Sequence, residues 1–242
     1  MEMRLVTLLN KNFDFEKNWH LRFIRCLNAY LDENLKDQIM SGSEYLSDES
    51  NKEEIFQWTN QTLQKLEKLT NEETRMNIML GCACHQPKEA LLEFRNIYKK
   101  TNDIDLVLEK MQEKFESFIK GTLNLENKYV DEIIQRNMGF AGKKDGKKII
   151  ATKIPKSAYI KEWFESTNKN EKRALFCHCP RIRDVLQDDT KILPKEYCFC
   201  GGGYYQDIWE TILEKSVKIE ILETVMHGGE VCKFAIHLPD GV

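Results

Sequence analysis

The sequence has no long apolar run and no excess of charge of one sign. No segment of its 242 residues approaches the roughly 18 apolar residues of a membrane-spanning helix. In "MEMRLVTLLNKNFDFEKNW", charge resumes too early for a signal peptide. The 36 Lys and Arg residues against 39 Asp and Glu residues give a net charge of −3, so no overall field attracts nucleic acid or an acidic membrane. We therefore expect a cytoplasmic protein that binds neither nucleic acid nor a membrane.

The glycine motifs of nucleotide-binding proteins are also missing. "CGGGYYQDIW" places three glycines before an expected helix, where backbone amides can face an anion. It has neither the Gly-x-Gly-x-x-Gly spacing of a dinucleotide fold nor the Lys-Ser/Thr of a P-loop. A close approach of the backbone to Cys198 and Cys200, or a tight turn into the helix, explains the glycines at least as well. The lysines of residues 143–148 have no flanking aromatic side chains, so we interpret them as a solvated turn.

Helical periodicity dominates the first part of the chain. One apolar stripe runs from Trp19 to Leu35 and a second runs from Ile104 to Ile119. We expect Asp48 or Ser50 to cap the helix that follows the first stripe. Further helices are expected near residues 52–68, 71–81, 88–100 and 125–138.

Strand patterns begin after Met138. The Asp145-Gly146 pair separates two short runs that can form a hairpin, and an apolar alternation follows Val217. We expect strands at residues 173–179, 216–225 and 230–238, and helices at residues 157–166 and 204–215. The predicted fold class is α+β: a helical N-terminal half (residues 1–138) followed by an antiparallel sheet with packed helices (residues 139–242).

Six of the eight cysteines occur in Cys-x-Cys pairs. In a reducing compartment such pairs more often bind metal or act as thiols than form disulfides. Thiolates and imidazoles suit zinc or an iron–sulfur cluster, so we predict a metal site among these cysteines. A compact site would use the last two pairs, and an alternative would combine the first pair with the second and join the two halves. The three pairs are Cys82 and Cys84, Cys177 and Cys179, and Cys198 and Cys200.

Two other interpretations of the cysteines stay open. Cys82, or Cys177 beside His178, could be a thiolate nucleophile. The cysteines could also be ordinary buried side chains, as we expect for Cys26 in the first helical stripe. His227 in the "MHGG" turn is placed to line a site.

The C-terminal stretch "YYQDIWETILEKSVKIEILETVMHGGEVCKFAIHL" resembles the end of 4-vinyl-reductase-type domains. It is also similar to the related L-2-amino-thiazoline-4-carboxylic acid hydrolase-like proteins. Gly229, Cys232 and Phe234 match the motif, whereas Met226 stands near the place where the family often has another cysteine. The resemblance implies an antiparallel sheet with helices on one face, often dimeric, around a small-molecule pocket.

Together these features predict a small-molecule-binding protein, sensory or regulatory, with a Cys-rich site for zinc or an iron–sulfur cluster. The expected ligand-pocket residues are His178, His85, His227 and Cys232. The alternative is a thiol- or metal-dependent hydrolase that acts on a small heterocycle or amide, with Glu223 or Asp207 beside an open metal position. A scaffold with a purely structural metal is a third alternative, and the resemblance makes a homodimer an expectation.

Overall fold

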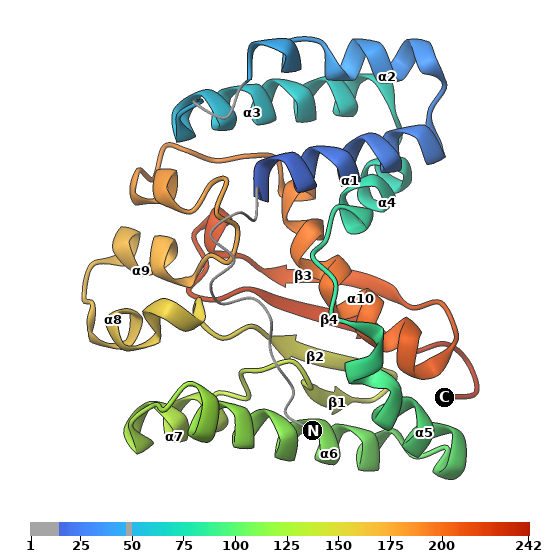
Figure 1. Ribbon diagram of the computed structural model, residues 1–242, viewed down its shortest axis with the longest axis vertical. Helices are drawn as coiled ribbons and strands as arrows, with labels where there is room; N and C mark the ends of the chain where they lie inside the picture. The colour runs from blue at the N-terminus through green and yellow to red at the C-terminus, as the bar shows by residue number, and fades with distance from the viewer. Residues whose placement is uncertain (1–14, 47–49) are drawn as a thin grey trace.

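The computed structural model describes residues 15–46 and 50–242. Helices make up the first part of these residues, as the periodicity predicts, and Figure 1 shows α1 to α3 at one end of the molecule and α6 and α7 at the other. The helices of this part are α1 (Phe15–Tyr30), α2 (Glu33–Met40), α3 (Lys52–Leu69), α4 (Glu72–Gly81), α5 (Leu92–Thr101), α6 (Ile104–Ser117) and α7 (Asn127–Gln135).

Side-chain caps decide where two of these helices begin. The first apolar stripe does not form a single helix up to Leu35, because Asp32 accepts a hydrogen bond from the Leu35 amide and starts α2. Asn51 caps α3 and exchanges reciprocal hydrogen bonds with Glu54. The prediction of Ser50 as that cap is therefore wrong, and Asp48 lies outside the described residues.

The second part of the chain supplies a four-stranded antiparallel sheet of order β1-β2-β4-β3. Both predicted hairpins are present, β1 with β2 and β3 with β4. Gly146, with φ of +59°, is the first residue of the two-residue loop in the first hairpin, the place for glycine in a type II′ turn. The strands are β1 (Lys143–Asp145), β2 (Lys148–Thr152), β3 (Lys218–Glu223) and β4 (Lys233–His237).

Three helices belong to this part: α8 (Ile160–Glu165), α9 (Lys169–Phe176) and α10 (Phe199–Leu213). The predicted strand at residues 173–179 is wrong, because Asn168 caps a helix there that ends at Phe176. Arg173 on α9 also donates hydrogen bonds to the carbonyls of Val225 and Met226, a contact with a distant turn. A short apolar run does not distinguish a helix from a strand by periodicity alone.

Helix α10 joins the two parts of the molecule. It begins five residues before the predicted start, so the three glycines lie inside it. It packs against α4 and α5 and against the sheet at β3. A Cβ atom at Gly203 would lie 2.0 Å from the carbonyl oxygen of Leu80, so only glycine allows α10 to approach the end of α4 this closely. One hydrophobic core extends through both parts.

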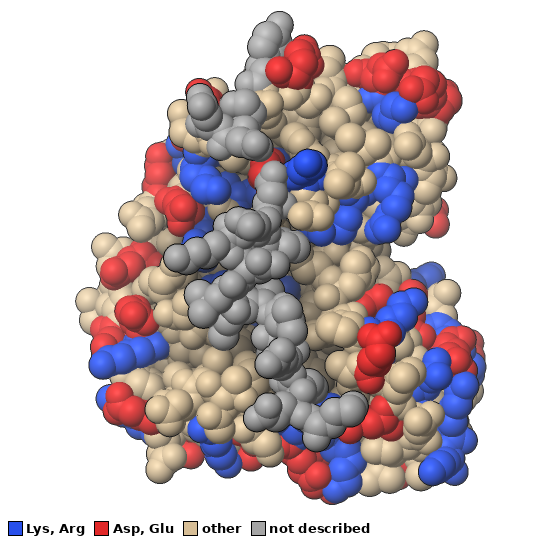
Figure 2. All heavy atoms as spheres, viewed as in Figure 1, with Lys and Arg blue, Asp and Glu red and all other residues tan. Residues whose placement is uncertain are grey.

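The surface carries charges of both signs. Around the edge of the face in Figure 2, Lys and Arg side chains lie among Asp and Glu side chains. Among the described residues, no helix combines the length and the apolar character needed to cross a membrane.

Candidate metal centre

Six cysteines from four segments of the chain are near enough for each to affect the pKa of at least one other, or to be affected by it. One follows α4, two follow α9, two lie at the start of α10, and one precedes β4. We refer to these six side chains as the thiol cluster: Cys84, Cys177, Cys179, Cys198, Cys200 and Cys232.

Cys179 lies within electrostatic range of three other thiols of this cluster. Burial is the largest cause that raises the pKa of Cys177, Cys198 and Cys200, and the nearby thiol of Cys179 adds to the increase in each case. The pKa of Cys200 rises to about 12. The other three cysteines of the compact predicted site therefore lie within electrostatic range of Cys179.

The remaining two cysteines extend this group. Besides burial, Cys232 raises the pKa of Cys177 and Cys198, and Cys84 raises that of Cys200. The cluster therefore also includes one thiol from the helical half. In residues 15–46 and 50–242, however, no three Cys, His, Asp or Glu side chains are arranged to hold one metal ion. The thiols are neighbours without forming the coordination sphere of a single ion.

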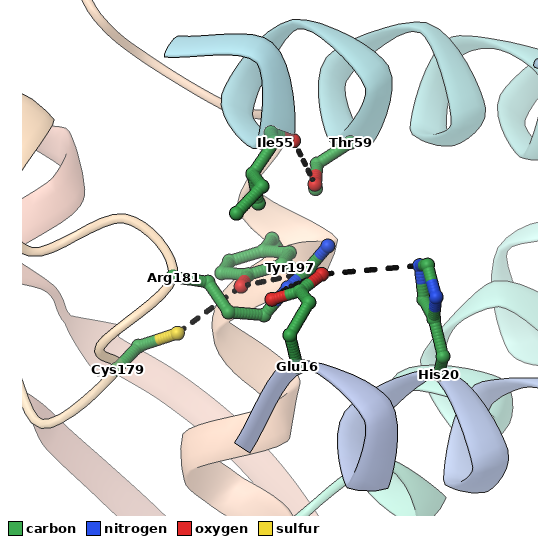
Figure 3. A network of polar contacts seen from close by, with 7 residues as sticks. All are labelled: Glu16, His20, Ile55, Thr59, Cys179, Arg181 and Tyr197. Carbon is green, nitrogen blue, oxygen red and sulfur yellow. Dashed lines mark hydrogen bonds and ion pairs between the residues drawn. The ribbon is translucent and has the colours of Figure 1, made fainter. Parts of the chain in front are cut away.

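A buried network of polar contacts holds Cys179 in place (Figure 3). The thiol of Cys179 lies 3.1 Å from the hydroxyl of Tyr197. Arg181 donates from Nη1 to the same hydroxyl at 3.4 Å and from Nε to both carboxylate oxygens of Glu16, at 2.9 and 2.8 Å. Glu16 is on α1, so this network connects the first helix to the thiol cluster.

Arg181 is the least solvated member of the network. Its side chain is 0% exposed, and its guanidinium carbon lies 3.6 Å from the centre of the Trp19 ring. Burial alone would lower the pKa of Arg181, but Tyr197 and Glu16 raise it above its ordinary value. Its Nη2 atom has no hydrogen-bond partner in the part of the chain that the structure describes. A buried cation with one unmatched nitrogen thus lies close to Cys179.

Further basic side chains surround the thiol cluster. Arg22 on α1 donates to the carbonyl of Cys82 at 3.0 Å, and its Nη2 lies 3.8 Å from the sulfur of Cys84. Lys153 lowers the pKa of Cys200 and Cys232 against the larger effect of burial. Its ammonium lies 5.2 Å from the centre of the Tyr204 ring, and no carboxylate among the described residues pairs with it.

Lys156 and Arg183 complete this basic group. Burial lowers the pKa of Lys156, Arg183 lowers it further, and the nearby thiol of Cys84 partly opposes both. Basic side chains therefore lie around the cluster, and one carboxylate, Glu223, is also near enough to add to the effect of burial in raising the pKa of Cys232.

The three predicted pocket histidines occupy different surroundings. Burial and Lys153 lower the pKa of His178 to about 3, so the ring is neutral at physiological pH. A neutral imidazole carries one N–H proton. The Ile154 carbonyl lies 2.8 Å from Nε2 and can only accept, so the proton is on Nε2 and Nδ1 is unprotonated. His227 has both ring nitrogens engaged, with Thr224 at 2.8 Å and the Leu193 carbonyl at 2.9 Å.

His85 lies on the surface, with Nδ1 3.2 Å from the carboxylate of Asp207. Glu223, the other carboxylate considered for hydrolysis, accepts hydrogen bonds from the amides of Glu230 and Val231. Both carboxylates thus have protein partners, and Glu223 is also near enough to Cys232 to raise the pKa of that thiol beyond the effect of burial.

Two hollows of the described surface do not contain the predicted pocket residues. One hollow of about 840 Å³ lies between α2 and α3, and one of about 360 Å³ lies beside α9. His85, His178, His227 and Cys232 line neither of them. The small-molecule pocket stays a prediction.

Sequence reasoning did not identify the network around Cys179. The position of Arg181, two residues after a predicted ligand, was a usable signal, because a basic residue that close can turn back toward the thiol. Nothing in the sequence connects Glu16 to it across the length of the chain.

Residues 124–242 match a family of unknown function, DUF6144. The matching part is similar to that family and contains five thiols of the cluster, whereas Cys84 and the network residue Glu16 lie before it. No curated protein and no solved structure matches the chain. The resemblance to 4-vinyl-reductase-type domains stays a prediction.

Proposed function

We propose that the thiol cluster binds a metal centre, preferably an iron–sulfur cluster, at the junction of the helical and sheet-rich parts. The observation that carries this proposal is the convergence of six thiols from four segments of the chain. Thiols that raise one another's pKa are close neighbours, because their thiolates would repel each other. A bound cation would offset this repulsion and lower the raised pKa values, since it stabilises the thiolates that it binds.

The charges around the cluster support this proposal. Thiolate-bound metal centres carry net negative charge when several thiolates share one centre. Arg22, Lys153 and Arg181 lie beside the thiols, and no carboxylate competes for Lys153 within the described residues. These basic side chains would offset the charge of bound thiolates. The neutral His178, with Nδ1 unprotonated and Nε2 donating to a carbonyl, has the arrangement typical of a ligand histidine.

The separation of the thiols favours a cluster over a single zinc ion. Four sulfurs around one zinc lie about 3.8 Å from one another, given zinc–sulfur distances near 2.3 Å. The thiols here are neighbours, yet no three are arranged for one ion. In an iron–sulfur cluster, the cysteines bind different iron atoms and stand further apart.

The position at the junction favours a structural or regulatory role for the metal centre. Cys84 comes from the helical half, the other five thiols come from the sheet half, and α1 reaches Cys179 through Arg181. Loss of the metal would therefore destabilise both halves, because the free energy of metal binding contributes to the stability of the fold. The two carboxylates considered for hydrolysis are held by His85 and by backbone amides, so hydrolysis is not part of this proposal.

The test is anaerobic purification followed by metal analysis, sulfide analysis and an absorption spectrum. We expect iron, inorganic sulfide and visible absorption in the wild type, and their loss together with a lower Tm in Cys179→Ser. Cys26→Ser, outside the thiol cluster, is the matched control and should keep the metal. If the analysis finds zinc without iron or sulfide, the thiol cluster is still a metal site, but the iron–sulfur cluster is wrong. A colourless, metal-free wild type with all eight thiols titratable would refute the proposal.

A further inference from the structure

Two cysteines lie against each other where α1 packs on α4. Cys26, on α1, is 7% exposed, and Cys82, directly after α4, is fully buried. Their side chains are near enough for each to shift the pKa of the other, and the thiol of Cys82 also lies 3.2 Å from the Ile78 carbonyl. Cys82 thus directs its thiol toward α1, while its backbone carbonyl faces Cys200.

Gly81 makes this contact possible. A Cβ atom at position 81 would lie 2.5 Å from the sulfur of Cys26, closer than real Cβ contacts. The sulfur of Cys26 therefore packs directly on the backbone of the residue before Cys82. A side chain at position 81 would separate the two thiols.

We propose that Cys26 and Cys82 form a peroxide-sensitive dithiol that closes to a disulfide between α1 and α4. The oxidant is hydrogen peroxide, which is small enough to reach a nearly buried thiol. The Cys26 thiolate attacks one peroxide oxygen, the O–O bond breaks, and water leaves after protonation, which gives Cys26 sulfenic acid. The sulfur of Cys82 then attacks the sulfur of Cys26, the S–O bond breaks, and a second water leaves. The two thiols lose two electrons and two protons, and the peroxide is reduced to two waters.

The surroundings of Cys26 support the first step. The side chain of Cys82 is the largest cause that lowers the pKa of Cys26, burial opposes it, and Arg25 lowers it further, to about 7. The side chain of Cys26 and burial raise the pKa of Cys82 well above its ordinary value. Of these two thiols, Cys26 is therefore the attacking thiol and Cys82 the resolving thiol.

The disulfide would act on the segment beside the thiol cluster. Arg22, one helical turn before Cys26, donates to the carbonyl of Cys82 and reaches the sulfur of Cys84. Oxidation would fix α1 to this segment through a covalent bond. The inference goes beyond the proposed metal centre and does not depend on it, because neither thiol belongs to the thiol cluster.

The experiment treats the full-length protein briefly with hydrogen peroxide, blocks free thiols with iodoacetamide, and maps the digested peptides by mass spectrometry. We expect two fewer alkylated thiols and a peptide pair joined through Cys26 and Cys82, both reversed by dithiothreitol. Cys26→Ser and Cys82→Ser should each abolish this pair. The matched control Cys84→Ser, from the same segment as Cys82, should still form it.

The mapping of the wild type decides the question even if a variant fails to fold. Cys26 recovered in alkylated form after oxidation, or Cys82 joined to Cys84 or Cys200, would overturn the proposal. Either result would leave the metal proposal standing, and a metal-free protein that forms the Cys26–Cys82 disulfide would refute only the metal proposal.

Discussion

Removal of Glu16 should destabilise the protein more than removal of its partner Arg181. Glu16→Ala leaves a guanidinium that is 0% exposed without its counter-ion, a change that costs roughly 3–5 kcal/mol when a buried pair is broken from one side. Arg181→Met keeps most of the aliphatic stem and leaves a carboxylate that is 25% exposed and can be hydrated. We estimate about 2 kcal/mol for that variant, mainly from the lost contact with the Trp19 ring and the lost hydrogen bonds.

The double variant tests whether the two side chains act as a pair. If they do, Glu16→Ala/Arg181→Met should cost less than the sum of the single variants by about 2 kcal/mol, since the second removal no longer leaves an unpaired charge. Urea unfolding followed by tryptophan fluorescence gives these free energies. Glu33→Ala is the control, because Glu33 forms an ion pair with Lys36 but is 78% exposed, and we expect less than about 1 kcal/mol.

An additive double variant, or a Glu16→Ala variant as stable as the control, would refute this reasoning. Either outcome would mean that the network in Figure 3 does not hold α1 to the segment of Cys179.

Three further predictions concern single residues. Gly203→Ala should lower the free energy of unfolding in urea by about 3 kcal/mol, because the new Cβ would lie 2.0 Å from the rigid Leu80 carbonyl oxygen. Gly121 has open space around it, so Gly121→Ala should stay within about 1 kcal/mol of the wild type. Equal effects of the two variants would contradict the packing of α10 on α4. The ring signals of His178 in NMR should not titrate between about pH 5 and pH 8, because its pKa is lowered to about 3, and a midpoint in that range would place the ring in water. The folded state lowers the pKa of Cys26 to about 7, so its contribution to stability is present above the unfolded pKa and is lost as the pH falls through 7. In reductant, the free energy of unfolding of the wild type should therefore rise relative to Cys26→Ser between about pH 7 and pH 9, and parallel curves would contradict the shift.

Local signals predicted much of the fold. Helices α3 and α4 were placed within one or two residues, because their periodicity is continuous and an asparagine caps each one. The hairpin of β3 and β4 is confirmed, since alternation along β3 and a short turn are features of adjacent residues.

Long-range contacts account for most of what the sequence did not reveal. The region of α9 was mistaken for a strand because its short apolar run is ambiguous and its anchor, the bonds from Arg173 to Val225 and Met226, joins distant segments. The start of α10 was placed too late because glycines disfavour helices intrinsically, whereas here they allow the approach to α4.

For the candidate site too, local signals were predictable from the sequence and long-range contacts were not. Cys-x-Cys spacing identified five of the six thiols as candidates, and the sixth, Cys232, came from the resemblance. Spacing could not show that the thiol of Cys82 turns toward Cys26, since that depends on the packing of α1 on α4. Spacing also could not show that the guanidinium of Arg181 stacks on the Trp19 ring, since that contact depends on how α1 packs against the rest of the chain.

The most direct test of the metal proposal is native mass spectrometry of the anaerobically purified protein, compared with the same sample under denaturing conditions. The account predicts a native mass that exceeds the denatured mass by the iron and sulfide of one cluster, and loss of that difference in Cys179→Ser. Identical native and denatured masses for the wild type would contradict a metal centre in the thiol cluster.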